Sequence, residues 1–198
     1  MVITINTIFA GMLFVFLNFN IEIGASKIGL IPGFLGYYFM LRGLTEIEWL
    51  SDKFTKVKPF VTVMIIFSGI AYALDLFGLP TEATLFIESI MIINVWTSAI
   101  AFIAMIFSLY ISYTIIMGIK DIEITKEQVL NSGRLYSTWK LVAVFSVLTF
   151  ALLIIPILLI ACMIINLVVG IYYLYIFYET TKLFNAIDFI IGADLKKN

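Results

Sequence analysis

Long apolar runs alternate with short charged segments along the whole chain. A membrane-crossing helix needs about 20 predominantly apolar residues. Runs of this kind predict six spans, at about residues 2–19, 28–44, 59–79, 97–117, 141–156 and 159–178. The last two come from one overlong run, which we divide at Pro156 because proline interrupts the hydrogen-bond ladder of a helix. The pattern predicts an all-α integral membrane protein, a single bundle over residues 1–198 with six transmembrane helices.

The apolar run from Ala83 to Ile119 is far too long for one crossing. The basic loops on either side of it belong to the same side of the membrane, so the run can add only one crossing after the third span. We expect residues 97–117 to make that crossing, with Trp96 as an interface anchor. Residues 82–95 would then form an outer or re-entrant segment, and a single long tilted helix is the alternative.

Basic residues are distributed unevenly between the two sides of the predicted bundle. Only Lys27 falls on one side. The other side receives Arg42, Lys53, Lys56, Lys58, Lys120, Lys126, Arg134, Lys140, Lys182, Lys196 and Lys197. The positive-inside rule places that second side, and both termini, in the cytoplasm.

Three charged segments carry apolar residues at helical spacing, which is typical of helices lying on a membrane surface. They are residues 45–58, 124–133 and the tail 183–198. We therefore expect short cytoplasmic interfacial helices, the last of them an amphipathic tail. Docking helices for a partner protein are the alternative interpretation.

Composition agrees with the membrane class and excludes several functions. Hydrophobic residues make up 63% of the chain and charged residues 13%, whereas soluble domains are nearer half apolar and a quarter charged. A net charge of −1 argues against a nucleic-acid partner. The chain has no histidine and only one cysteine, Cys162, so we expect no metal site, disulfide or cofactor. No catalytic motif is present, and we predict that the protein is not an enzyme.

Acidic residues gather on the predicted outer side. Asp75 and Glu88 flank the turn region around Gly78–Pro80, and Glu82 and Glu22 belong to the same side. Carboxylates within a span are costly and tend to face a cavity, water or a partner. The four acids would then form an outward-facing, cation-attracting vestibule. The alternative places them in the hydrated headgroup layer, where they bind nothing.

Small and polar residues share one face of the fourth predicted span. They are Asn94, Ser98, Ala101, Ser108 and Ser112. Such a face usually allows close helix packing, and a polar pore lining is the alternative. Asn166, in the sixth span, is more typical of an interhelical hydrogen bond than of a ligand contact.

One stretch in the second span resembles a known sequence pattern. PGFLGYYFMLRGL, residues 32–44, is similar to uncharacterised multi-pass inner-membrane proteins of low-GC Gram-positive bacteria through the residues Pro32, Phe34, Gly36, Tyr37, Gly43 and Leu44. The resemblance covers about two spans and implies a bacterial inner-membrane location. It implies no activity. In size and expected topology alone, the chain also resembles the substrate-capture subunits of energy-coupling-factor importers.

Two functions remain open at the level of sequence. The first is a transport-related role as a small carrier, channel or substrate-capture subunit, with a cationic ligand suggested by the acidic outer side. The second is a non-catalytic accessory, regulatory or immunity-type subunit of a membrane complex. Besides the lipid bilayer, a protein partner or a second copy of the chain would suit either role. Deep polar residues around one cavity would favour transport, and a sealed apolar core would favour the accessory role.

Overall fold

Helices make up most of the chain. The computed structural model describes residues 4–16, 20–23, 26–29, 32–76, 95–127, 129–152 and 155–194. Its elements are α1 (Thr4–Phe16), β1 (Asn20–Ile23), β2 (Ser26–Gly29), α2 (Gly33–Ile47), the 3-10 turn η1 (Glu48–Leu50), α3 (Asp52–Leu76), α5 (Val95–Lys126), α6 (Ser132–Ala151) and α7 (Pro156–Asp194).

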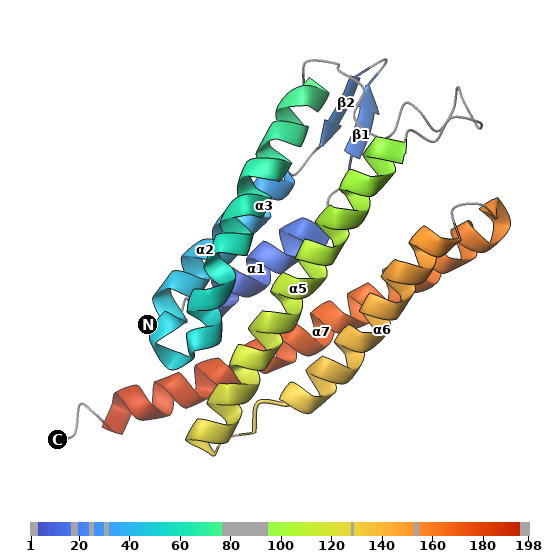
Figure 1. The fold of residues 1–198 in the computed structure, drawn as a ribbon. Helices are drawn as coiled ribbons and strands as arrows, with labels where there is room; N and C mark the ends of the chain where they lie inside the picture. The colour runs from blue at the N-terminus through green and yellow to red at the C-terminus, as the bar shows by residue number, and fades with distance from the viewer. Residues whose placement is uncertain are drawn as a thin grey trace.

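The six described helices pack in chain order and close into a ring (Figure 1). Each described helix contacts the next described helix along the chain. The connections from α2 to α3, from α5 to α6 and from α6 to α7 are short, which makes these pairs antiparallel neighbours. The ring closes where α7, the last helix, packs against α1, the first. The strands β1 and β2 form an antiparallel hairpin at the end of the bundle where α3 ends, and α3 contacts β2.

Within the described part of the chain, three helices are long and apolar enough to cross a membrane, over Asp52–Leu74, Ala99–Lys126 and Ile157–Ala186. Many of their large apolar side chains are exposed on the outside of the bundle, as expected of surfaces that face lipid. The prediction of a helical membrane protein is confirmed to this extent. Six crossings stay a prediction.

The expected start of the second span needs one correction. In the hairpin, Asn20 pairs with Gly29 and Ile21 pairs with Ile28. Ile28 was expected to open the second span, but it belongs to β2, and α2 begins only at Gly33. The reason is local: Gly29 weakens a helix and Pro32 disfavours helical geometry in the residue before it, so a helix begins readily only after the proline.

Separate interfacial helices over residues 45–58 and 124–133 are not what the structure shows. The first segment divides between the end of α2, the turn η1 and the start of α3. Its apolar residues Ile47, Phe54 and Val57 are buried in the bundle core, so they do not face lipid headgroups. The second segment divides between the end of α5 and the start of α6.

The described part of the predicted tail 183–198, residues 183–194, is also part of a longer helix. α7 continues to Asp194 without a break, and Leu183 and Phe184 pack against the core. The helix break expected at Pro156 is confirmed, since α6 ends at Ala151 and α7 begins at the proline. Proline suits this first helical position because the N–H it lacks would have no partner there.

Glycines allow α1 and α2 to approach closely. A Cβ added to Gly36 would lie 2.7 Å from the carbonyl oxygen of Gly11, and one added to Gly11 would lie 2.5 Å from the carbonyl oxygen of Gly36. Small residues at helix crossings are a main source of stability in membranes, where lipid is as apolar as the side chains. The two glycines therefore set the spacing of the first helical pair.

We predict that Gly36→Ala destabilises the protein by about 1–3 kcal/mol, the usual cost of overpacking. Gly69→Ala is the matched control, because its Cβ would find only the Phe34 Cβ, at 4.0 Å. That control should gain up to about 1 kcal/mol from helix propensity. Unfolding in detergent, followed by circular dichroism, measures both. Equal midpoints for the two variants would contradict the close approach of α1 and α2.

Candidate functional site

A cavity of about 180 Å³ lies inside the ring. Every described helix except α3 contributes to its wall. The polar side chains of the wall are all uncharged: Tyr37, Ser108, Ser112, Trp139, Ser146 and Tyr173. Apolar residues complete the wall, among them Met12, Met40 and Met105, whose flexible thioethers adapt to irregular shapes.

Helical periodicity brings these polar groups together. Ser108 and Ser112 are four residues apart and therefore share one face of α5. Trp139, Val142 and Ser146 follow one another at intervals of three and four residues on α6, and they share a face in the same way. Both faces point into the ring because the outer faces of these helices are apolar and exposed.

The two buried tyrosines reach across the cavity from different helices. The Tyr173 hydroxyl of α7 donates to the Met12 sulfur of α1 at 3.7 Å and lies within hydrogen-bonding reach of Ser112. Tyr37 of α2 lies within reach of Ser108. The Ser112 hydroxyl donates to the backbone carbonyl of Ser108 at 3.0 Å. The cavity thus offers neutral donors and acceptors, which suit an uncharged ligand.

One donor in the cavity wall has no partner. The indole Nε1–H of Trp139 is buried and donates to nothing in the described part of the chain. The ring itself is held in place, with its centroid 5.1 Å from that of Tyr113 and stacked on Tyr136 at 5.9 Å. A buried unpaired donor costs about 1–3 kcal/mol. A ligand that accepts this hydrogen bond would recover that free energy.

A groove of about 440 Å³ adjoins the cavity on the outside of α6 and α7. Its lining includes Thr149 of α6 and Asn166 of α7, with Phe16 at the end of α1. The Asn166 amide donates weakly to Ser146 at 3.4 Å, and its carbonyl oxygen is buried without a partner. Sequence analysis anticipated the interhelical bond of Asn166 but not this unpaired acceptor.

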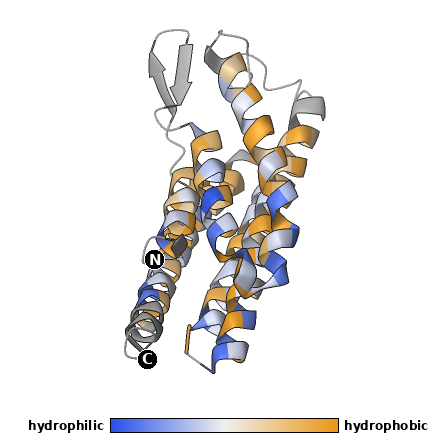
Figure 2. Ribbon diagram, turned by 90° about the vertical axis from the view of Figure 1, so that its left-hand side faces the viewer, coloured by the Kyte–Doolittle hydropathy of each residue, from blue (hydrophilic) through white to orange (hydrophobic). Residues whose placement is uncertain are grey.

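The described ion pairs lie at one end of the bundle, where α5 ends and α6 begins and hydrophilic residues gather (Figure 2). Asp121 of α5 accepts hydrogen bonds from Ser51 at 2.9 Å and from the Lys53 ammonium at 2.9 and 3.0 Å. These contacts join the start of α3 to the end of α5. The nearby Glu48 and Lys58 form an ion pair between the α2–α3 turn and α3.

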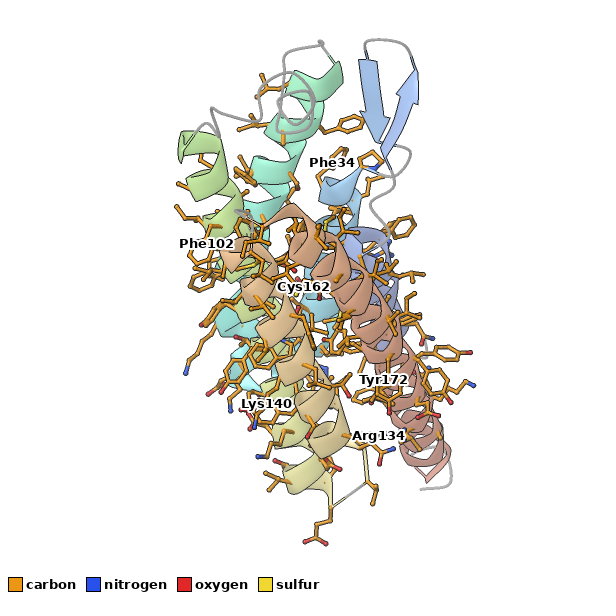
Figure 3. The ribbon with its side chains drawn as sticks, turned by 90° about the vertical axis from the view of Figure 1, so that its right-hand side faces the viewer. Phe34, Phe102, Arg134, Lys140, Cys162 and Tyr172 are labelled. Atoms are coloured by element: carbon orange, nitrogen blue, oxygen red, sulfur yellow. The ribbon has the colours of Figure 1, made fainter. Side chains whose placement is uncertain are left out.

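Two further contacts join α6 and α7 at the same end. Arg134 donates to the Tyr172 hydroxyl at 3.0 Å and lies 3.7 Å from the Glu179 carboxylate (Figure 3). The hydrogen bond to Tyr172, together with the charge of Glu179, raises the pKa of Arg134. The backbone N–H groups of Leu130 and Ser132 donate to Glu123, which fixes the α5–α6 turn.

The structure places only part of the predicted acidic vestibule. Asp75 lies in the last turn of α3, and Glu22 lies in β1 opposite Lys27. Both elements are at the end of the molecule remote from the charged contacts (Figure 1). Glu82 and Glu88 lie outside the described residues, so the vestibule stays a hypothesis. No cluster of three metal-ligating side chains occurs among the residues that the structure describes.

The polar face of the fourth predicted span maps onto α5. Ser108 and Ser112 line the cavity, and Ala101 is partly buried but does not. Ser98 lies on the same helix, in a part where side chains are not described, and Asn94 lies outside the described residues. Sequence analysis missed Tyr37, Trp139 and Tyr173 as cavity residues. The polar spacing along α6 could have indicated Trp139, and no such spacing indicated Tyr37 or Tyr173.

No protein-family model, curated protein or solved structure matches this chain. The cavity and the groove are therefore the features that indicate a function.

We predict that Asn166→Leu, which is nearly isosteric, stabilises the protein by about 1 kcal/mol because it removes an unpaired buried acceptor. Asn185→Leu on the same helix is the control. Asn185 donates to Asn6 at 3.1 Å, and losing that bond should cost about 0.5–1 kcal/mol. Denaturant unfolding in mixed micelles measures both variants. Destabilisation by Asn166→Leu would mean that its carbonyl oxygen is satisfied in the folded protein.

Proposed function

We propose that this chain is a cell-membrane protein with six crossings and a transport-related role, in which the cavity holds one small ligand. The observation that carries the proposal is the cavity itself, enclosed by five helices and lined by neutral polar groups. A core built only for stability would be packed without such a space. Deep polar residues around one cavity are also the feature that distinguishes transport from an accessory role.

The arrangement of charges supports six crossings with both termini in the cytoplasm. The nine Lys and Arg residues from Arg42 to Lys182 lie in the halves of their helices, or in the adjoining turns, that point to one end of the ring. If each helix crosses the membrane, consecutive helices run in alternating directions, and the parts that carry Lys and Arg then all fall on one side. α1 is the shortest of the described α-helices, about 20 Å long at 1.5 Å per residue. A helix of this length does not cross the whole bilayer, so the segments that flank it would have to cross the rest.

Volume and chemistry limit the ligand. An apolar cavity of about 150 Å³ in another protein accommodates benzene. The cavity in this chain is slightly larger, at about 180 Å³, and adds hydroxyl and indole groups. The ligand would therefore be about the size of one aromatic ring and uncharged. A separate hypothesis is that the acidic residues at the outer end attract cations before these enter the membrane.

An accessory role is the second candidate, and the length of α7 favours it. α7 has 39 residues, or about 58 Å, which exceeds the thickness of a hydrocarbon core by far. Its C-terminal part extends past the ends of α2 and α3 at the end where the described ion pairs lie (Figure 1). That extension offers a surface on which a cytoplasmic protein could dock.

Cysteine labelling tests the topology. In a Cys162→Ala background, we expect Ser26→Cys and Leu152→Cys to react with a membrane-impermeant maleimide on intact cells. Thr55→Cys and Ser137→Cys should react only after permeabilisation, because they lie at the charged end. Labelling of all four positions from one side would overturn six crossings.

Native mass spectrometry of gently extracted protein tests the ligand. We expect a bound small molecule on the parent protein and its loss from Ser112→Leu, which fills the cavity. Ser68→Leu is the matched control, since Ser68 also bonds a carbonyl one turn earlier but lies on α3, outside the cavity wall. Retention of the bound mass in Ser112→Leu would contradict the cavity as its site. A stoichiometric protein partner without a small molecule would favour the accessory role.

A further inference from the structure

Phe16 separates the interior cavity from the membrane-facing groove. It is the one residue that lines both spaces. The groove side is formed by Met163, Ile164 and Leu167 of α7, which are more than half exposed and belong to a helix that can cross the membrane. The groove therefore opens toward lipid, and only the Phe16 side chain and its neighbours stand between lipid and the cavity.

The Phe16 ring rests directly on α7. A Cβ added to Gly170 would overlap three atoms of that ring, so glycine is required for the ring to lie where it does. Phe16 belongs to the last turn of α1. Two other rings of α1 stack elsewhere, Phe9 on Phe177 and Phe14 on Phe39. The absence of a side chain at Gly170 thus leaves room on α7 for the Phe16 ring at the end of α1.

The two unpaired polar atoms lie along the same route. Asn166, whose carbonyl oxygen has no partner among the described residues, lines the groove, and Trp139, whose N–H has none there either, lines the cavity. Between them, Ser146 lines the cavity and accepts the weak bond from Asn166. Trp139 and Ser146 are seven residues apart on α6, or about 10 Å. A molecule moving from groove to cavity would meet an acceptor first and a donor second.

We propose that Phe16 gates a lateral entrance between α1, α6 and α7, through which an uncharged, mainly apolar molecule bearing a hydroxyl or amide group passes from the bilayer into the cavity. The inference rests on the proposed function, because it assumes that the cavity takes a ligand. The ligand class follows from the route. A charged molecule would be costly in the hydrocarbon layer, and a molecule with no polar group would leave both Asn166 and Trp139 unpaired.

Fluorescence quenching of Trp139 tests the entrance. Trp49→Phe and Trp96→Phe leave Trp139 as the only tryptophan, in protein reconstituted into phosphatidylcholine vesicles. The probe is 2,2,2-tribromoethanol, a small uncharged alcohol whose bromines quench indole. Saturable loss of intensity reports occupation of the cavity, and the dependence of the fluorescence lifetime on probe concentration reports access to it. Ser112→Leu should abolish the saturable component.

We expect Phe16→Ala to increase several-fold the slope with which the Trp139 fluorescence lifetime falls as the probe concentration rises. Phe14→Ala, which removes a ring of the same helix end that lines neither space, should leave it unchanged. Gly170→Ala is the second variant, because it displaces the ring without removing it, and it should act like Phe16→Ala. Unchanged far-ultraviolet circular dichroism checks that each variant is folded.

The outcomes separate the entrance from the proposed function. Saturable quenching with equal lifetime slopes for Phe16→Ala, Gly170→Ala and Phe14→Ala would overturn the gate while leaving the cavity as a ligand site. Saturable quenching, with a steeper lifetime slope in Phe16→Ala and Gly170→Ala but not in Phe14→Ala, would support both the ligand cavity and the gate. Absence of saturable quenching in every variant would overturn the ligand cavity, and the gate with it.

Discussion

The packing of α1 against α7 is the contact on which the rest of the structure depends. A ring of six helices encloses an interior only if the first and last helices meet, and in this chain they are separated by the whole of the sequence. Burial alone does not drive such a contact in a bilayer, because lipid is as apolar as leucine. Close packing and a few polar bonds carry it instead: Phe9 stacked on Phe177, Phe16 seated on Gly170, Tyr173 bonded to Met12, and Asn185 bonded to Asn6.

The chain separates its polar groups by charge. The described ion pairs lie at one end, where Asp121 and Arg134 join neighbouring helices and water is within reach. Serine and tyrosine hydroxyls occupy the interior. The Ser112 hydroxyl bonds a carbonyl of its own helix, and the Tyr173 hydroxyl bonds Met12 of another helix, so both tolerate low polarity. The charged end aligns the helices, and the neutral interior decides which molecules the cavity accepts.

Sequence patterns predicted the helical class, the break at Pro156 and the polar face that contains Ser108 and Ser112. They failed at residues 45–58, because apolar residues at helical spacing form the same pattern whether they face lipid headgroups or a protein core. Ile47 and Phe54 show that here it faces the core. The aromatic wall of the cavity could not be predicted either. Tyrosine and tryptophan in an apolar span are normally interface anchors, and only the closed ring brings three helices' aromatic residues to one space.

Cross-linking of α1 to α7 tests closure of the ring most directly. Asn6 and Asn185 face each other across this contact, with the amide nitrogen of one 3.1 Å from the amide oxygen of the other. In a Cys162→Ala background, the pair Asn6→Cys and Asn185→Cys should be joined within one chain by a short thiol-reactive cross-linker, in membranes and without denaturation. Failure to link, or links formed only between two chains, would show that the ring is open and that no enclosed cavity exists.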